Sequence, residues 1–302
     1  MDKIRQNLFP VLAAIIWGLA FSAQADCALK GMEPFTFNGL RALIAVIVLF
    51  FVAISFAKGF GNIKIQLSDK EYLKNLVLGG LCCGSALFLA SNLQQAAFSE
   101  ETESGKVGFI TVFYLMLVPV FALFLKKKST FNVWISVVLA LVGMYFLCIE
   151  KGMGFTVNTH DLFAFGCAIV FAIHILVIDH FTNKVNGIHL SLMQFFFVSL
   201  FSFICAFIFE TPSIEVVYNC IWQVLYVGVF SSGVAYTLQI LAQKGSNPTV
   251  VTLLLSLESV FAVIFGALIL GEVLSLREYI GCGIMFIAVI LAQIPVKRKI
   301  KK

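Results

Sequence analysis

Charged residues are scarce in this sequence of 302 residues: Asp, Glu, Lys and Arg make up 12% of it, whereas hydrophobic residues make up 60%. A soluble protein of this length needs far more charge to cover its surface. The mean hydropathy of +0.99 points the same way. The composition therefore excludes a soluble globular protein and predicts an all-α membrane protein that crosses a bilayer several times.

Sequence motifs of metal binding, nucleotide hydrolysis and hydrolytic catalysis are also absent. The chain has eight cysteines, but none forms a CxxC pair or a Cys/His spacing, so we interpret them as small packing residues. No GxxxxGK[ST], HExxH or GxSxG motif occurs. We therefore expect no cofactor, no metal site, no ATP hydrolysis and no enzymatic activity.

What the sequence has instead is a series of long apolar segments. A helix needs about 20 apolar residues to cross the hydrocarbon core, and ten segments approach or reach this length. They cover approximately residues 7–26, 34–57, 72–97, 104–125, 131–149, 161–181, 188–209, 217–243, 247–270 and 276–295. The stretch SAQAD at 22–26 also fits signal-peptide cleavage, which would leave nine segments. We predict ten helices, because the repeat described below requires the first one.

Basic residues are distributed unevenly between the two sides of these segments. With the N-terminus inside, most lysines and arginines fall on the inner side, including KKK at 126–128 and the tail KRKIKK at 297–302. The outer side receives only Lys30, Lys106, Lys151 and Arg277. The positive-inside rule then places both termini in the cytoplasm and the protein in the cytoplasmic membrane. The same distribution attributes the net charge of +5 to anchoring beside anionic lipid, and not to nucleic-acid binding.

The two halves of the chain show a weak but collinear similarity. GLCCGSALF at 80–88 matches GVFSSGVAY at 228–236, and PVFA at 119–122 matches SVFA at 259–262. Each half holds five predicted helices, an odd number, so the second copy lies upside down relative to the first. The sequence thus predicts two inverted repeats, at residues 1–150 and 151–302. This architecture is typical of transporters that bind substrate between the halves and expose it alternately to each side.

Two stretches resemble a known family. AAIIWGLAF at 13–21 and FNGLRALIA at 37–45 are similar to the opening of the EamA-like branch of the drug/metabolite transporter superfamily, with Trp17, Gly18 and Arg41 at its motif positions. SLESVFAVIFGALILGEVLSLREYIGCG at 256–283 resembles the end of the family pattern. The resemblance implies a ten-helix transporter, commonly an exporter, of small metabolites such as amino acids and their relatives.

One residue departs from the family pattern in a way that bears on structure. Ser259 stands where the family usually has proline, whereas the first half keeps Pro119 at the matching position. Proline interrupts the hydrogen bonding of a helix and bends it. A kink is therefore expected at Pro119, and the corresponding feature of the second half is left open.

Ionisable residues within the apolar segments are the first candidates for substrate binding or ion coupling. An acidic side chain at a helix centre costs roughly 2.5–3.5 kcal/mol on insertion scales. Glu258 lies at mid-depth, and it either binds a substrate amine or a proton or forms an interhelical hydrogen bond as the neutral acid. Arg41 either holds a substrate carboxylate or has a structural role, by snorkelling or by pairing with an acidic residue such as Glu33. His174 is either a proton carrier or a buried packing residue.

Amides and aromatic residues supply the remaining candidates. Asn92, near the outer end of the third segment, and Gln239, towards the inner end of the eighth, offer hydrogen bonds at the two cavity mouths or are ordinary interfacial polar residues. Tyr114 carries a hydroxyl at mid-depth, and Trp17 belongs to the family motif. Phe88 and Tyr236 coincide in the repeat. Aromatics in these places suit a mostly apolar pocket for an organic solute, or they are core residues.

Together these features predict a secondary transporter of small organic metabolites, driven by the solute gradient or by an ion, with protons as the candidate. An intramembrane lipid-modifying enzyme and a small-solute channel are the alternatives. The enzyme would need clustered catalytic groups, and the channel would need a filter-like loop or a series of acidic residues. Saturable transport separates a carrier from a channel, and product formation identifies an enzyme.

Overall fold

The computed structural model describes residues 2–56, 68–98, 104–127, 129–148, 159–265 and 275–294. Within these ranges all regular structure is helical, as predicted. The first half contains α1 (Asp2–Leu29), α2 (Pro34–Phe56), α4 (Lys70–Ala97), α5 (Ser104–Thr111), α6 (Tyr114–Phe124) and α7 (Phe131–Cys148). The second half contains α8 (Thr159–Phe181), α9 (Gly187–Phe209), α10 (Ile214–Asn219), α11 (Ile221–Tyr226), the π-helix η1 (Val227–Ala235), α12 (Tyr236–Gln243), α13 (Pro248–Leu255), α14 (Glu258–Phe265) and α15 (Leu276–Gln293).

The apolar segments of the sequence coincide with these helices. Eight helical stretches in the described part of the chain are long and apolar enough to cross a membrane. The segments predicted at 131–149 and 247–270 fall on two shorter apolar stretches, Phe131–Leu147 and Pro248–Ala262. Many large hydrophobic side chains face outward, among them Phe51, Phe124, Phe207 and Ile290, each more than 60% exposed. Such an apolar surface is stable against lipid and not against water, so this is a multi-pass membrane protein.

Polar residues define several helix ends. Asp69, Asn186 and Asn247 each accept backbone N–H bonds at the start of α4, α9 and α13. Ser275 and Glu278 form a reciprocal capping box at the start of α15. These contacts satisfy the N–H groups that the first helical turn leaves without partners.

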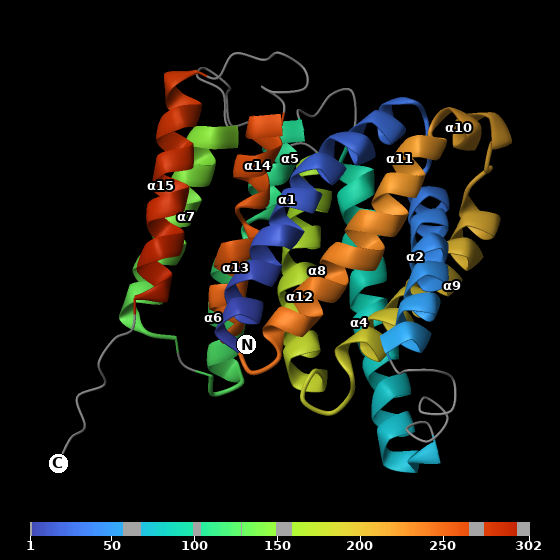
Figure 1. The fold of residues 1–302 in the computed structure, drawn as a ribbon. Helices are drawn as coiled ribbons and strands as arrows, with labels where there is room; N and C mark the ends of the chain where they lie inside the picture. The colour runs from blue at the N-terminus through green and yellow to red at the C-terminus, as the bar shows by residue number, and fades with distance from the viewer. Residues whose placement is uncertain are drawn as a thin grey trace.

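The helices form a bundle in which segments distant in sequence lie side by side (Figure 1). At one end α7 packs against α15, and at the other α2 packs against α9. Between them α4 packs on α8 and α9, while α1 packs on α12, α13 and α14. The first residues of α1 and the end of α15 lie on the same face of the bundle in Figure 1.

Glycines allow several of these helices to approach closely. Gly80 and Gly84 on α4 lie against Met193 and Gln194 of α9, and an added Cβ would come within 2.5 and 2.8 Å of them. Gly143 on α7 and Gly281 on α15 face each other in the same way, with 2.8–3.0 Å between a Cβ at one and the carbonyl oxygen of the other. Small residues at helix contacts are typical of membrane proteins, because close packing there replaces the hydrophobic driving force.

Candidate functional site

Two helices of the bundle are interrupted, and the interruptions lie at a buried cavity. Val112 and Phe113 separate α5 from α6, and residues 256–257 separate α13 from α14. The residues on either side of each break all line the cavity: Thr111, Tyr114, Leu255 and Glu258. The kink expected at Pro119 is therefore not where the chain breaks, since Pro119 lies inside α6.

The backbone at each interruption tightens into turns with shorter hydrogen-bonded rings. Phe113 N–H donates to Ile110 O over 3.1 Å, and Leu257 N–H donates to Leu254 O over 3.3 Å. The hydroxyl of Ser256 donates to Leu253 O at 2.9 Å, which satisfies a carbonyl near the second break. At membrane depth, backbone N–H and C=O groups need hydrogen-bond partners within the protein. These bonds supply such partners at the two breaks, neither of which contains a proline.

A third irregular segment borders the same cavity. The π-helix η1 covers nine residues, Val227–Ala235, and Tyr236 N–H donates to Ser231 O across its wider turn. Both Ser231 and Tyr236 line the cavity. Pi-helical segments occur frequently at functional sites, because they reposition side chains relative to a regular helix. Apart from its small residues, nothing in the amino-acid pattern of 227–235 predicts a π-helix.

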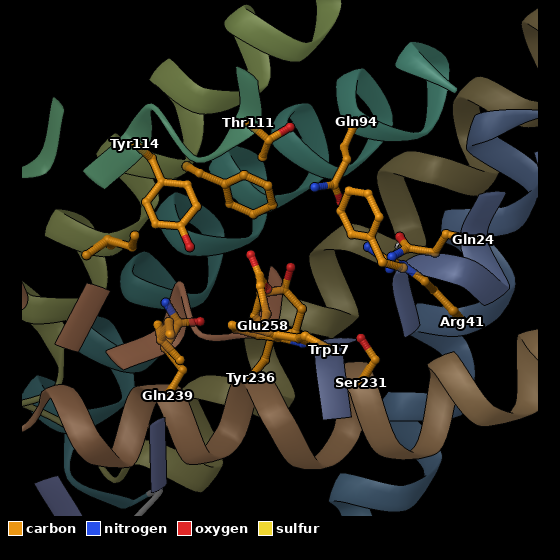
Figure 2. Close-up of a pocket in the computed structure, with 14 residues that line it drawn as sticks. Trp17, Gln24, Arg41, Gln94, Thr111, Tyr114, Ser231, Tyr236, Gln239 and Glu258 are labelled. Carbon is orange, nitrogen blue, oxygen red and sulfur yellow. Dashed lines mark hydrogen bonds between the residues drawn. The ribbon is translucent and has the colours of Figure 1, made fainter. Parts of the chain in front are cut away.

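The cavity lies between helices of both halves. Figure 2 shows Tyr114, Gln239 and Glu258 directing their polar ends into a common space, with Arg41 and Gln24 together to one side. The space open to the centres of water molecules is about 50 Å³. One water needs about 10–15 Å³ on this measure, so the cavity in this conformation has room for a few waters. An organic solute requires the helices around it to move apart.

Glu258 is the acidic group of the cavity, and α1 holds it in place. The carboxyl interacts with the hydroxyl of Tyr114, which begins α6. On the other side Gly18 lies directly against the first turn of α14: a Cβ added there would come within 2.9 Å of Glu258 O and 2.8 Å of Ala262 N. The Trp-Gly pair in α1 therefore has a structural explanation, because Gly18 allows the contact that places Trp17 and Glu258 beside one another.

Arg41 is the basic group of the cavity and is only 3% exposed. Its Nη1 donates to Gln24 Oε1 at 3.0 Å, its side chain interacts with the Tyr236 hydroxyl, and the guanidinium lies 5.6 Å from the Phe37 ring centre. Within the described residues, Arg41 neither reaches the surface nor pairs with Glu33. The side chain is buried instead of reaching the surface, and Glu33 accepts a bond from Thr211 N–H instead of pairing with it.

Several polar atoms at the cavity have no hydrogen-bond partner within the described part of the protein. They are Trp17 Nε1, Arg41 Nε, Thr111 Oγ1 and Gln239 Oε1. Neither Arg41 nor Glu258 forms an ion pair within the described residues. Buried polar groups without partners are costly, and an unpaired buried charge costs several kcal/mol. The cavity therefore presents donors and an acceptor that a polar solute or water can satisfy.

Three of the nine residues predicted from the sequence lie outside the cavity lining. His174, 0% exposed, pairs with Gln194 Oε1 at 3.1 Å and stands behind Tyr236, with ring centres 6.3 Å apart. Asn92 accepts a bond from Asn38 at 3.0 Å, and Phe88 stacks on Phe35. The other six, Trp17, Arg41, Tyr114, Tyr236, Gln239 and Glu258, are brought together. Whether any of the nine binds substrate stays a prediction.

The lining also includes residues that sequence reasoning passed over, notably Gln24, Thr111 and Phe171. A signal for Gln24 was present. Trp17, Phe21 and Gln24 have the spacing i, i+4, i+7 of one helix face, and all three line the cavity. An amide on the face that carries the Trp-Gly motif could have been selected for that reason.

The fold and the cavity define a class: a helical multi-pass membrane protein with a buried polar site between helices distant in sequence. The EamA-like transporter family model matches residues 5–149 and again residues 158–293, so the chain belongs to the EamA-like transporter family. A relative from Archaeoglobus fulgidus, named as an uncharacterized transporter, is 32% identical over 98% of this chain and 88% of its own length.

Two further comparisons agree in length and fold. The uncharacterized transporter YoaV of Bacillus subtilis is 24% identical over 94% of this chain and 96% of its own. A solved structure, titled only as the crystal structure of a protein, superposes with a TM-score of 0.77 at 18% identity, over 95% of this chain and 96% of that one. At that identity the superposition establishes the shared fold, and the family match establishes a membrane transporter.

Proposed function

We propose that this protein is a secondary transporter that exports small organic metabolites bearing an amino and a carboxylate group, such as amino acids and related compounds. The observation that carries the proposal is the buried cavity that holds one acidic and one basic side chain, Glu258 and Arg41, without an ion pair between them. A carboxylate on the solute would satisfy the free Nε of Arg41, and an amine would satisfy Glu258. Protons are the candidate coupling ion, exchanged at Glu258.

The transport cycle we propose is alternating access between two inverted five-helix halves, 1–150 and 151–302. Two matches to one family model, at 5–149 and 158–293, support the repeat. The packing supports it as well, because contacts between the halves come in related pairs. The third helix of the first half, α4, packs on α8, the first of the second half, just as α12 packs on α1. The second helix of each half repeats the pattern: α4 of the first half packs on α9 of the second half, and η1 of the second half packs on α2 of the first half.

Membrane orientation follows from the same proposal. The basic connections and the tail lie on the cytoplasmic side, so both termini are cytoplasmic and the membrane is the cytoplasmic one. In this orientation the loop at 210–213 faces outward and the loop at 244–247 faces the cytoplasm.

The test is transport in proteoliposomes loaded with a mixed pool of amino acids and related metabolites, with and without a pH gradient. The wild type is expected to release a subset of the pool with saturable kinetics. Glu258→Gln removes the acid with little change of shape, and it should abolish the pH dependence and lower the rate at least tenfold. Glu215→Gln, an exposed carboxylate on α10, serves as the matched control and should transport normally.

The outcomes separate the alternatives. Release that does not saturate would indicate a channel, and chemically altered solutes would indicate an enzyme. If a folded Glu258→Gln variant transports like the wild type with its pH dependence intact, the glutamate has a structural role. The binding site would then have to be sought around Arg41 and Tyr114.

A further inference from the structure

A neutral amide holds the buried guanidinium at one side of the cavity. Gln24 lies near the end of α1 and is 6% exposed, and its Oε1 accepts a hydrogen bond from Arg41 Nη1 at 3.0 Å. The ring of Phe37 lies against the same guanidinium, with 5.6 Å between its centre and Arg41 Cζ. Figure 2 shows Gln24 and Arg41 together beside the cavity. The charge of Arg41 is therefore held in place by two groups that carry no charge themselves.

Gln24 is in turn fixed by a second amide. Gln95 of α4 is 2% exposed, and its Nε2 donates to the backbone oxygen of Gln24 at 3.0 Å. This bond joins α4 to α1 at the residue whose side chain reaches Arg41 on α2. The two hydrogen bonds thus connect three helices and leave the guanidinium little freedom to turn. A binding group that is already oriented loses little conformational entropy when its ligand arrives.

A purely structural role would favour an acid at position 24. A carboxylate there would accept the same hydrogen bond from Arg41 and add the attraction of opposite charges, which is strong where water is excluded. It would also cancel the positive charge that the cavity presents to a solute. Glutamine has nearly the shape of glutamate, so the amide keeps the geometry and leaves the charge uncompensated.

We propose that Gln24 is a positioning residue that makes the cavity selective for carboxylates, because it orients Arg41 without neutralising it. This inference rests on the proposed function, since it takes a solute carboxylate as the partner of Arg41. Gln24 acts through the guanidinium. It occupies Nη1 and leaves the Nε of Arg41, which has no hydrogen-bond partner within the described residues, for the solute.

The decisive comparison is between two substitutions at position 24. Gln24→Ala removes the acceptor and leaves Arg41 charged but less well oriented, so the Kd for a carboxylate solute should rise about threefold to tenfold. Gln24→Glu keeps the acceptor but places a second negative charge beside the solute carboxylate, so the Kd should rise by at least about thirtyfold. A role in structure alone predicts the opposite order, because glutamate restores the hydrogen bond that alanine loses.

The probes for this comparison are L-leucine and L-leucinamide, whose apolar side chain suits Ile175 and Leu255 in the lining. They differ only in the carboxylate, and calorimetry with purified full-length protein measures their binding. Leucinamide should lose no more than about twofold in affinity for either variant. Gln293→Glu makes the same amide-to-acid change at an exposed position of α15, and it should bind both probes like the wild type.

Two results of the binding measurement would overturn the proposal. One is a leucine affinity of Gln24→Glu that equals or exceeds that of Gln24→Ala. The other is an equal loss of affinity for leucine and leucinamide, because a general disturbance of the cavity would weaken both.

A measurement without any solute tests whether Gln24 and Arg41 act on each other. Gln24→Glu is made in the wild type and in Arg41→Gln, and thermal unfolding in detergent is recorded for each. With Arg41 present the new carboxylate has a partner and should raise the melting temperature, whereas in Arg41→Gln it is buried alone and should lower it. The two shifts should differ by at least about 3 °C. A smaller difference would overturn the positioning role, and so would failure of Gln24→Glu to fold while Arg41 is present.

The two measurements distinguish this inference from the proposed function. If the wild type binds neither probe and moves no solute, the proposed function and the carboxylate selectivity fail together, and thermal unfolding still decides whether Gln24 holds Arg41. If leucine binds equally well to the wild type and to Gln24→Glu, the proposed function stands and the role of Gln24 is refuted.

Discussion

At the scale of single residues, the most informative side chain is Arg41. It is buried at a cavity, its Nη1 bonds a neutral amide, and its Nε has no partner in the described structure. Burying a charge without a partner of opposite charge is expensive, and a structural ion pair would have offset part of that expense. The arrangement is favourable only when something else in the cavity supplies the opposite charge, which is what a solute carboxylate would do.

This reading predicts the effect of two substitutions at Arg41. Arg41→Gln removes the charge and should raise the apparent Kd for a carboxylate solute by about tenfold to a hundredfold, the loss of one charged hydrogen bond worth about 1.5–3 kcal/mol. Arg41→Lys keeps the positive charge but loses the planar guanidinium, so its Kd should lie between those of the wild type and Arg41→Gln. Binding is measured by tryptophan quenching or calorimetry with the acid and with its amide derivative. Equal affinity of wild type and Arg41→Gln for the acid would show that Arg41 does not bind carboxylate.

At the scale of elements, the contact between α1 and α14 determines where Glu258 sits. The contact depends on Gly18, because a Cβ at this position would lie only 2.8 Å from Ala262 N and 2.9 Å from Glu258 O of α14. The atoms nearby are mostly backbone atoms, which cannot turn aside as the end of a side chain can. A methyl group at this position must therefore push the two helices apart.

The prediction for α1 compares two glycines. Gly18→Ala should destabilise the protein by about 1–3 kcal/mol and reduce transport by shifting Glu258. Gly283→Ala on α15 adds the same methyl group where nothing lies within 4 Å, and should be neutral or slightly stabilising because alanine favours the helix. Thermal unfolding in detergent gives the comparison. If both variants unfold like the wild type, α1 and α14 are not in the close contact described.

Sequence reasoning reached the helices more completely than the site. Long apolar segments identify spans because lipid offers the backbone no hydrogen bonds, so the predicted segments fell on helices throughout the described chain. The helix breaks before Tyr114 and Glu258, and the π-helix, do not change the hydrophobicity of the sequence and so cannot be predicted from it. The stretch VVTLLLSLES at 250–259 has no glycine or proline, so nothing in it marks the interruption at 256–257.

The site residues show the same division. Glu258 and Arg41 could be selected because charge within an apolar segment is costly wherever it points. Asn92 and Phe88 are on α4 but face α2 or its neighbours instead of the cavity, and one sequence does not reveal the rotation of a helix. Gln94, two residues further along, does line the cavity.

At the scale of the whole molecule, the proposed orientation predicts which loops are reached from outside the cell. Pro212 and Lys244 are both exposed, in the loops at 210–213 and 244–247. Pro212→Cys should react with a membrane-impermeant maleimide on intact cells, and Lys244→Cys only after the cells are opened. The labelling of wild-type protein measures how much maleimide reacts with the native cysteines, and this background is subtracted. The reverse pattern would place the termini outside and overturn the orientation.

The interrupted helix at Glu258 also has a consequence for how the protein is made. Helix α13 has eight residues, about 12 Å of the roughly 30 Å hydrocarbon core, and Glu258 follows after the break at 256–257. Such a segment partitions poorly into lipid on its own. It becomes stable beside α1, which offers Gly18 to α14 and precedes both segments by a long stretch of chain. Biosynthesis must therefore keep α1 available, with that face uncovered, until α13 and α14 have also been made.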